Sequence, residues 1–153
     1  MTPHQPDPAA QVVAPDPALE AAARRAGLSP ATARALARGA AIYHHGLFWE
    51  AHEAWEEAWL EEEGAPRLLL HGLIQLAAAF HKAVAQRQSG GCVRLFTTAL
   101  EKLEKLQAAG GIDLPAVREG CARALALAVA WHAGRGPPPG RGDAPVIGAA
   151  PSK

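Results

Sequence analysis

The feature that most constrains this chain is the segment from Leu68 to Phe80, LLLHGLIQLAAAF. Drawn as a helix, it is apolar on nearly every side, so it has no face suited to water. A membrane-spanning helix needs about 20 apolar residues, and this segment is shorter. We therefore expect other helices to surround it, as the buried central element of a helical protein.

The segments on both sides of this core also read as helices. Their starts carry capping residues followed by proline, and their ends carry glycine. The predicted helices cover about 17–26, 30–45, 47–62, 66–88, 92–108 and 114–131. None of the segments alternates in the way that predicts a strand. Short connections favour antiparallel neighbours. The sequence predicts an all-α fold, a compact antiparallel helical bundle of five to six helices with a buried central helix.

The two ends of the chain differ from the middle in composition. Residues 1–16 are polar and punctuated by proline, and residues 134–153 are rich in proline and glycine, which disfavour a helix. We expect a disordered N-terminal tail over 1–16, a single helical bundle domain over 17–133, and a disordered tail over 134–153. The total length of 153 residues suits one domain.

The net charge and the N-terminal sequence indicate which binding partners and which cellular location to expect. The chain has 15 Lys and Arg and 15 Asp and Glu, and this zero net charge argues against a nucleic-acid partner. The N-terminus lacks the basic start and apolar stretch of a signal peptide. We expect a cytoplasmic, soluble protein without a membrane partner. Cys92 and Cys121 lie in helical patterns among apolar residues, which predicts small buried side chains rather than a disulfide.

The segment 47–60, LFWEAHEAWEEAWL, holds most of the candidate functional residues. On a helical wheel one stripe is mainly aromatic and contains Phe48, His52, Trp55 and Trp59. The other side carries Glu50, Glu53 and Glu57, which we expect to face water or a partner. Glu56 lies at the edge of the aromatic stripe, one turn after His52. His52 and Glu56 are therefore predicted to form a partly buried pair beside the tryptophans.

Gln75 is the second candidate, because it lies in the most apolar part of the chain. A buried amide needs hydrogen-bond partners, and His52 or Glu56 would supply one. His81 lies on another flank of the same helix, about 80° away. We predict one network of His52, Glu56 and Gln75 inside the bundle, with Glu50 as a weaker member.

These residues also carry a resemblance. FWEAHEAWEEAW followed by GLIQLAAAFHK is similar to the bacterial, archaeal and plastid family called domain of unknown function 309. The resemblance covers roughly residues 40–107 and departs from the family at Ser89-Gly90-Gly91, where members usually have Gly-Asn. It implies a compact helical bundle and no activity. The family's motif positions fall on Phe48 or Trp49, Glu50, His52, Glu53, Glu56, Trp59, Gly72, Gln75 and His81.

Three interpretations of this constellation remain open from the residues. In the first, His52, Glu56, Gln75 and His81 form a structural network that fixes the register of the helices. In the second, a divalent metal binds to His52, Glu56 and His81. This is not the zincin pattern, and a ferritin-like site would need carboxylates that the central helix lacks. In the third, the tryptophans wall a pocket for acid–base chemistry or for a flat or cationic ligand.

The outer face of the same helix offers a further class of function. Its glutamates form an acidic strip that suits either water or a basic partner. We predict a non-enzymatic binding or protein-interaction module, with an unknown protein or small ligand as partner and no cofactor. The alternative is a metal-binding protein or metal-dependent enzyme using His52, Glu56 and His81, with Glu53 as general base; whether it is an enzyme stays open. An apolar face can pair with a second copy, so we expect a monomer or small homo-oligomer.

Overall fold

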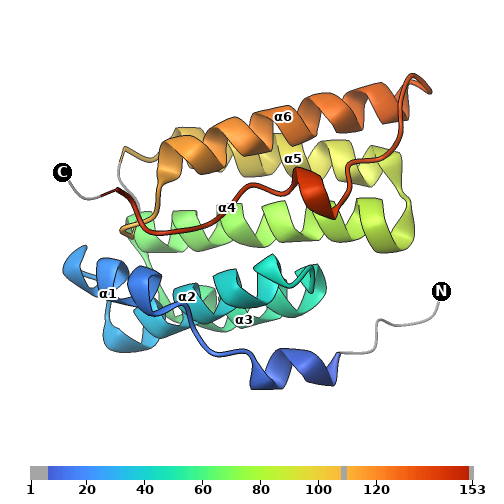
Figure 1. Ribbon diagram of the computed structural model, residues 1–153. Coiled ribbons are helices and arrows are strands. Elements are labelled where there is room, and N and C mark those ends of the chain that lie inside the picture. Colours follow the sequence, from blue (N-terminus) through green and yellow to red (C-terminus); the bar gives the residue numbers. More distant parts are fainter. Residues whose placement is uncertain (1–6, 108–109, 152–153) are drawn as a thin grey trace.

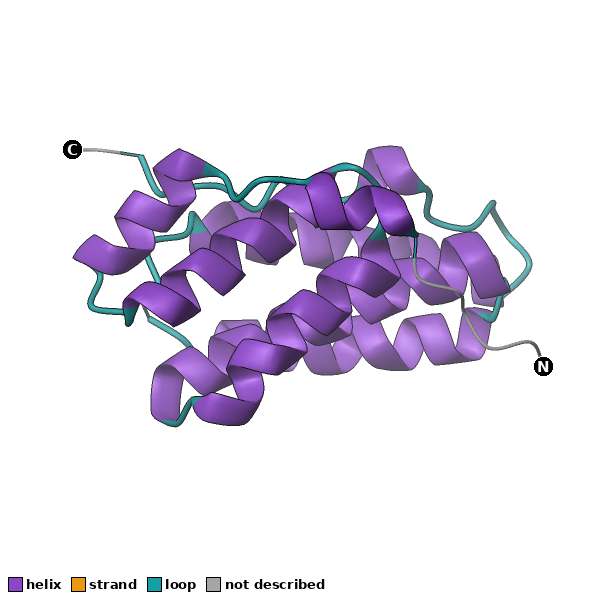
Figure 2. Ribbon diagram, turned by 90° about the horizontal axis from the view of Figure 1, so that it is seen from below, coloured by secondary structure: helices purple, strands orange, loops and turns teal. Residues whose placement is uncertain are grey.

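The computed structural model describes residues 7–107 and 110–151. These residues form six α-helices and contain no β-strand, which confirms the predicted all-α bundle (Figure 2). The helices are α1 (Pro17–Arg25), α2 (Pro30–His44), α3 (Phe48–Glu61), α4 (Gly64–His81), α5 (Ser89–Glu104) and α6 (Leu114–His132). Two 3-10 turns, η1 (Pro8–Val12) and η3 (Arg141–Asp143), and a π turn, η2 (Lys82–Gln86), complete the elements.

Three helix starts form where the capping residues predict them. The Asp16 carboxylate accepts the Ala18 N–H at 3.0 Å, and the Ser29 hydroxyl accepts the Thr32 N–H at 3.2 Å. Asp113 caps α6 in the same way, through the Ala116 N–H at 3.3 Å. Each cap is followed by proline in the first turn. A cap satisfies a backbone donor that the helix leaves unpaired, so the local sequence is sufficient to place these starts.

Helix α4 is the central element of the bundle. It lies between α3 and α5, while α2 packs on α3 and α6 packs on α5 (Figure 1). Its buried residues include Leu69, Leu73, Leu76 and Phe80, as the apolar segment predicts. Gly72 lets α5 approach closely, because an added Cβ would lie 3.0 Å from the Leu103 side chain.

The helical stretch Gly64–Gln86 spans 23 residues and is long and apolar enough to cross a membrane by length and composition alone. This stretch is longer than residues 68–80, the apolar segment that we expected to be too short to span a membrane. In its most apolar window, 61% is buried inside the structure, as in the core helix of a soluble protein.

The two cysteines are free and buried, as predicted. Burial raises the pKa of the Cys92 thiol to about 11. Burial, with a smaller contribution from Glu104, raises the pKa of Cys121 to about 12. Both side chains therefore act as small apolar residues of the core.

The N-terminal segment differs from the predicted tail. Residues 1–6 lie outside the described residues, but Asp7 caps the turn η1 (Pro8–Val12), which packs against the bundle and buries Ala10. The Arg38 guanidinium donates to the Ala10 carbonyl at 3.1 Å. Proline prevents a long helix here, yet it favours a capped turn, and such a turn can pack without further structure.

The C-terminal segment differs from its prediction as well. Residues 152 and 153 lie outside the described part, and the preceding segment, here called the strap (residues 141–151), runs back along the bundle from the end of α6 (Figure 1). Ile147 is fully buried, and Pro145 packs on Gly120 of α6. The Asp113 N–H donates to the Gly148 carbonyl at 2.9 Å. Glycine and proline exclude a helix, but an extended chain can still bury its apolar residues.

Candidate functional site

A pocket of about 330 Å³ lies at one end of the bundle, where α2 ends, α3 begins and α4 passes into η2. The π turn η2 brings two small apolar residues, Val84 and Ala85, to its wall. Its polar lining includes two residues that the sequence singled out, Glu50 and His81. The other lining residues are Asp7, Gly46, Leu47, Phe48 and Trp49.

Glu50 is the buried carboxylate of this pocket. Its exposed fraction is 7%, and its Oε1 atom accepts the backbone N–H of Asp7 at 3.0 Å. The sequence predicted that Glu50 lies on the outer side of the helix, facing water or a partner, and that it is a weaker member of the network. Its burial under the N-terminal segment corrects the expectation of an outward-facing side chain. The wheel missed it because the covering element is the N-terminal segment, which the sequence predicted as disordered. A carboxylate in the first turn also interacts favourably with the helix dipole.

Trp49 joins the two histidines of the candidate set. Its indole stacks on the His52 ring at 4.9 Å between centroids, with an interplanar angle of 24°. It also contacts the His81 ring at 5.2 Å and 45°. His81 itself is buried, with 7% exposure. The structure therefore brings Trp49 and His52 of α3 together with His81 of α4 as one aromatic group.

His52 and Glu56 form the predicted pair, with 3.3 Å between His52 Nε2 and Glu56 Oε2. The pair lies at the surface edge of the bundle, because 48% of the Glu56 side chain is exposed. A contact whose carboxylate is half exposed contributes little to stability. His52 Nδ1 is enclosed and has no hydrogen-bond partner among the described residues.

Gln75 does not join this pair. It lines a separate pocket at the boundary of α4 and α5, together with Arg94 and Thr98. Its Oε1 atom is enclosed and lacks a partner within residues 7–107 and 110–151. The physical reason is the position of α4 between two helices, since a side chain directed toward α5 cannot reach α3 (Figure 1).

A second aromatic cluster occupies the other end of α3. The Arg67 guanidinium lies over the Trp59 ring at 4.1 Å and donates to the Trp59 carbonyl at 3.2 Å. The His71 ring is 5.1 Å from Trp59. Burial lowers the pKa of His71, and Lys102 and Arg67 lower it further. The sequence identified Trp59 but missed Arg67; a cation a few residues after a tryptophan-ended helix was the available signal.

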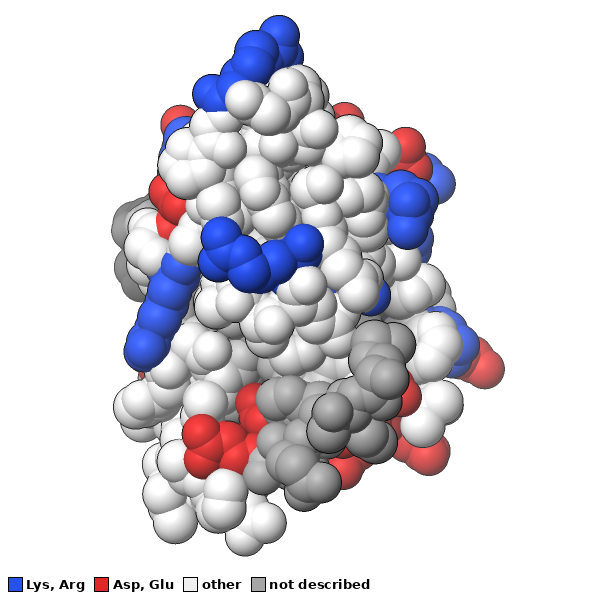
Figure 3. Space-filling view, turned by 90° about the vertical axis from the view of Figure 1, so that its right-hand side faces the viewer, with Lys and Arg blue, Asp and Glu red and all other residues white. Residues whose placement is uncertain are grey.

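The charges of the chain are segregated although their sum is zero. All Lys, Arg, Asp and Glu positions of helix α3 are Glu, and Glu53, Glu57 and Glu61 are exposed. Residues 64–100, in contrast, contain no Asp or Glu. Figure 3 shows the result on the end face: Lys and Arg extend over its middle and top, and acidic side chains gather mainly toward the bottom. The pocket thus belongs to a molecule with an uneven surface potential.

No three His, Cys, Asp or Glu side chains that could hold a metal ion lie together in the described parts of the chain. In particular, His52, Glu56 and His81 do not form such a group. The Trp49 indole contacts both imidazoles, as given above.

Comparison with known proteins agrees with this architecture. No curated protein matches the chain. Residues 36–95, which extend from within α2 to within α5, match the family model described as "Domain of unknown function (DUF309)". This match covers Glu50, His52, Glu53, Glu56, Trp59, Gln75 and His81. The resemblance in the sequence is confirmed, because the helical region that carries the candidate site matches the model of this family of unknown function.

Proposed function

We propose that the chain is a non-enzymatic binding module and that the pocket containing Trp49, Glu50 and His81 is its ligand site. The observation that carries the proposal is the buried Glu50 carboxylate, which accepts a backbone N–H from a segment outside the bundle. A carboxylate accepts hydrogen bonds from N–H groups. A pocket lined by one is therefore suited to a ligand with N–H groups.

The rest of the pocket narrows the ligand class. Trp49 adds an aromatic surface to the pocket lining. Val84 and Ala85 add an apolar wall. The combination suits a small ligand, or a short segment of a protein, that presents an ammonium or amide N–H beside an apolar part.

The arrangement of rings supports binding over the metal alternative. A zinc ion would need ligand atoms within about 2.0–2.2 Å, and therefore His52 and His81 nitrogens close to one another. The indole of Trp49 contacts both rings instead, at centroid distances of 4.9 and 5.2 Å.

The test is a titration with benzylammonium, followed through the indole N–H signal of Trp49 by NMR, with neutral benzyl alcohol as the matched probe. We expect saturable shifts with benzylammonium that weaken at least about tenfold in Glu50→Gln, because the charge that attracts the cation is lost. Glu53→Gln, one turn away on the exposed face, should leave them unchanged. Equal responses of wild type and Glu50→Gln, or no saturation at all, would contradict the proposal.

We also propose, from composition and charge, a cytoplasmic protein without a nucleic-acid or membrane partner and without a cofactor, acting as a monomer or small homo-oligomer.

A further inference from the structure

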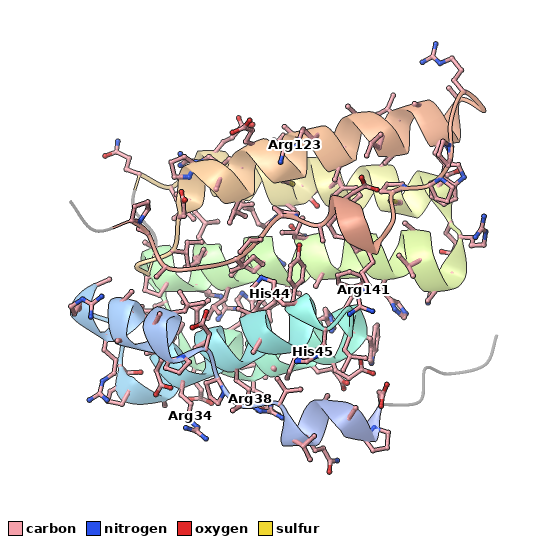
Figure 4. The ribbon with its side chains drawn as sticks, in the orientation of Figure 1. Arg34, Arg38, His44, His45, Arg123 and Arg141 are labelled. Carbon is pink, nitrogen blue, oxygen red and sulfur yellow. The ribbon has the colours of Figure 1, made fainter. Side chains whose placement is uncertain are left out.

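The N-terminal segment is held through its backbone by two side chains of opposite charge. The Glu50 carboxylate accepts the Asp7 N–H at 3.0 Å. Three residues later, the Arg38 guanidinium donates to the Ala10 carbonyl at 3.1 Å. Figure 4 shows Arg38 on the side of α2 that faces η1. Neither contact depends on the identity of the bound residue, so the two charges recognise main-chain geometry.

The geometry that they recognise is a capped turn. The Asp7 side chain accepts the Ala9 N–H at 2.9 Å, which closes the turn from within. Ala10 is buried at 5% exposure, whereas Val12 is 85% exposed. The bundle therefore buries a small residue at one position of the segment and leaves the end of the segment in water.

The same start occurs a second time in the chain. Asp16-Pro17-Ala18 repeats Asp7-Pro8-Ala9, and Asp16 accepts the Ala18 N–H at 3.0 Å. There the turn continues into α1 and buries Leu19 completely. An Asp-Pro-Ala sequence thus forms the capped turn in two different surroundings, which indicates that the turn is encoded locally and is already shaped for binding.

From these contacts we propose that Arg38, Glu50 and the adjoining pocket form a peptide-binding groove for capped Asp-Pro-Ala turns, and that residues 7–12 occupy it as an internal ligand. This rests on the proposed function and names its partner class: a protein segment with an acidic cap, a proline and a small residue three positions after the cap. Such a segment in another protein competes with residues 7–12 for the groove. The linkage within one chain gives the internal segment an effective concentration in the millimolar range, so it regulates access.

The test uses the full-length protein and an acetylated peptide of residues 7–15 that is labelled at its C-terminus. Ala10→Arg displaces the internal segment, because arginine cannot occupy the buried position of Ala10. Displacement removes Asp7 from the pocket wall but leaves Arg38 and Glu50 unchanged. We expect this variant to bind the peptide at least about tenfold more tightly than wild type, by fluorescence anisotropy. Adding Glu50→Gln or Arg38→Gln should reverse the gain, and adding Arg34→Gln, on the same helix, should not.

A peptide that is N-methylated at Asp7 lacks the donor for Glu50 and should bind the Ala10→Arg protein at least about tenfold more weakly. Equal binding of both peptides, or no binding to a folded Ala10→Arg protein, would overturn the groove. Circular dichroism reports whether the variant is folded. Amide exchange in residues 7–12 of Glu50→Gln, which should be faster than in wild type, tests the internal contact separately. Benzylammonium binding in the same proteins shows whether the pocket itself still functions, so the two proposals fail independently.

Discussion

Gly39 determines how closely α2 and α3 approach. The Trp55 indole crosses α2 at this residue, where an added Cβ would lie 2.2 Å from Nε1. Trp55 is fully buried, and its Nε1–H donates to the Leu36 carbonyl at 3.1 Å. A glycine in a helix normally costs stability, but here it makes room for the largest side chain of the core.

We therefore expect Gly39→Ala to lower the free energy of unfolding by about 1–3 kcal/mol, although alanine is the better helix former. The indole or the backbone of α2 must move to accommodate the methyl group. Denaturant unfolding followed by tryptophan fluorescence measures the change. Gly142→Ala is the control, because nothing lies within 4 Å of the added carbon there. A Gly39→Ala protein as stable as wild type would contradict this account of the packing.

Glu50 and Glu56 show what a single helical wheel can and cannot predict. The wheel correctly pairs Glu56 with His52, at 3.3 Å. It places Glu50 in water, whereas Glu50 is buried and Glu56 is half exposed. Periodicity describes one helix in isolation, and the burial of Glu50 depends on η1, which the periodicity of α3 does not contain.

At the scale of elements, the strap is fastened to the end of α2 by a histidine. His44 Nε2 accepts the Ile147 N–H at 3.0 Å, so this nitrogen must be unprotonated. Burial lowers the pKa of His44 from its usual value of 6.5, against an opposing effect of Asp16, and His45 lowers it further. Arg141 of the strap lines the same small pocket as His44, and Figure 4 shows both residues at the end of α2.

This contact predicts a pH dependence with a definite sign. The pKa of His44 is lower in the folded than in the unfolded chain, so its contribution to stability is complete above the unfolded value and is lost as the pH falls through the folded value. We expect the amide-exchange protection of Ile147, corrected for intrinsic exchange, to fall between about pH 7.5 and about pH 5.

Two variants separate this effect from general acid sensitivity. His44→Ala removes the acceptor, so protection of Ile147 should be low at both pH values. His45→Ala, the exposed neighbour, should still lose protection of Ile147 as the pH falls, with the loss beginning at a slightly higher pH because His45 lowers the pKa of His44. Unchanged protection of Ile147 across this range in wild type would show that the histidine does not control the strap.

At the scale of the whole molecule, the described residues contain no group of three His, Cys, Asp or Glu side chains that could hold a metal ion, and this bears on metal content. We expect untagged protein, purified without chelator, to contain no stoichiometric zinc, iron or manganese by elemental analysis. His52→Ala should give the same result. About one equivalent of metal in wild type and none in His52→Ala would instead favour the metalloprotein alternative, with Glu53 as the first candidate for a general base.

The sequence by itself determined the helices and their central member. Asp16, Ser29 and Asp113 cap helices through contacts within three residues, so these starts need no tertiary information. The segment 68–80 is apolar on nearly every side of its helix. It must therefore be buried, whatever the arrangement of the other helices. The His52–Glu56 pair belongs to the same class, since one helical turn brings both side chains together.

Only the tertiary structure decided the site and the ends of the chain. Glu50 is buried by a segment 43 residues away in sequence, Gln75 is directed toward α5 rather than α3, and the Ile147 amide meets His44 across 103 residues. The proline and glycine content predicts that both ends of the chain avoid long helices. It does not predict that these ends pack against the bundle. Local patterns fix the conformation of a segment, whereas burial and hydrogen bonding depend on which distant segment covers it, and that is a property of the packed chain.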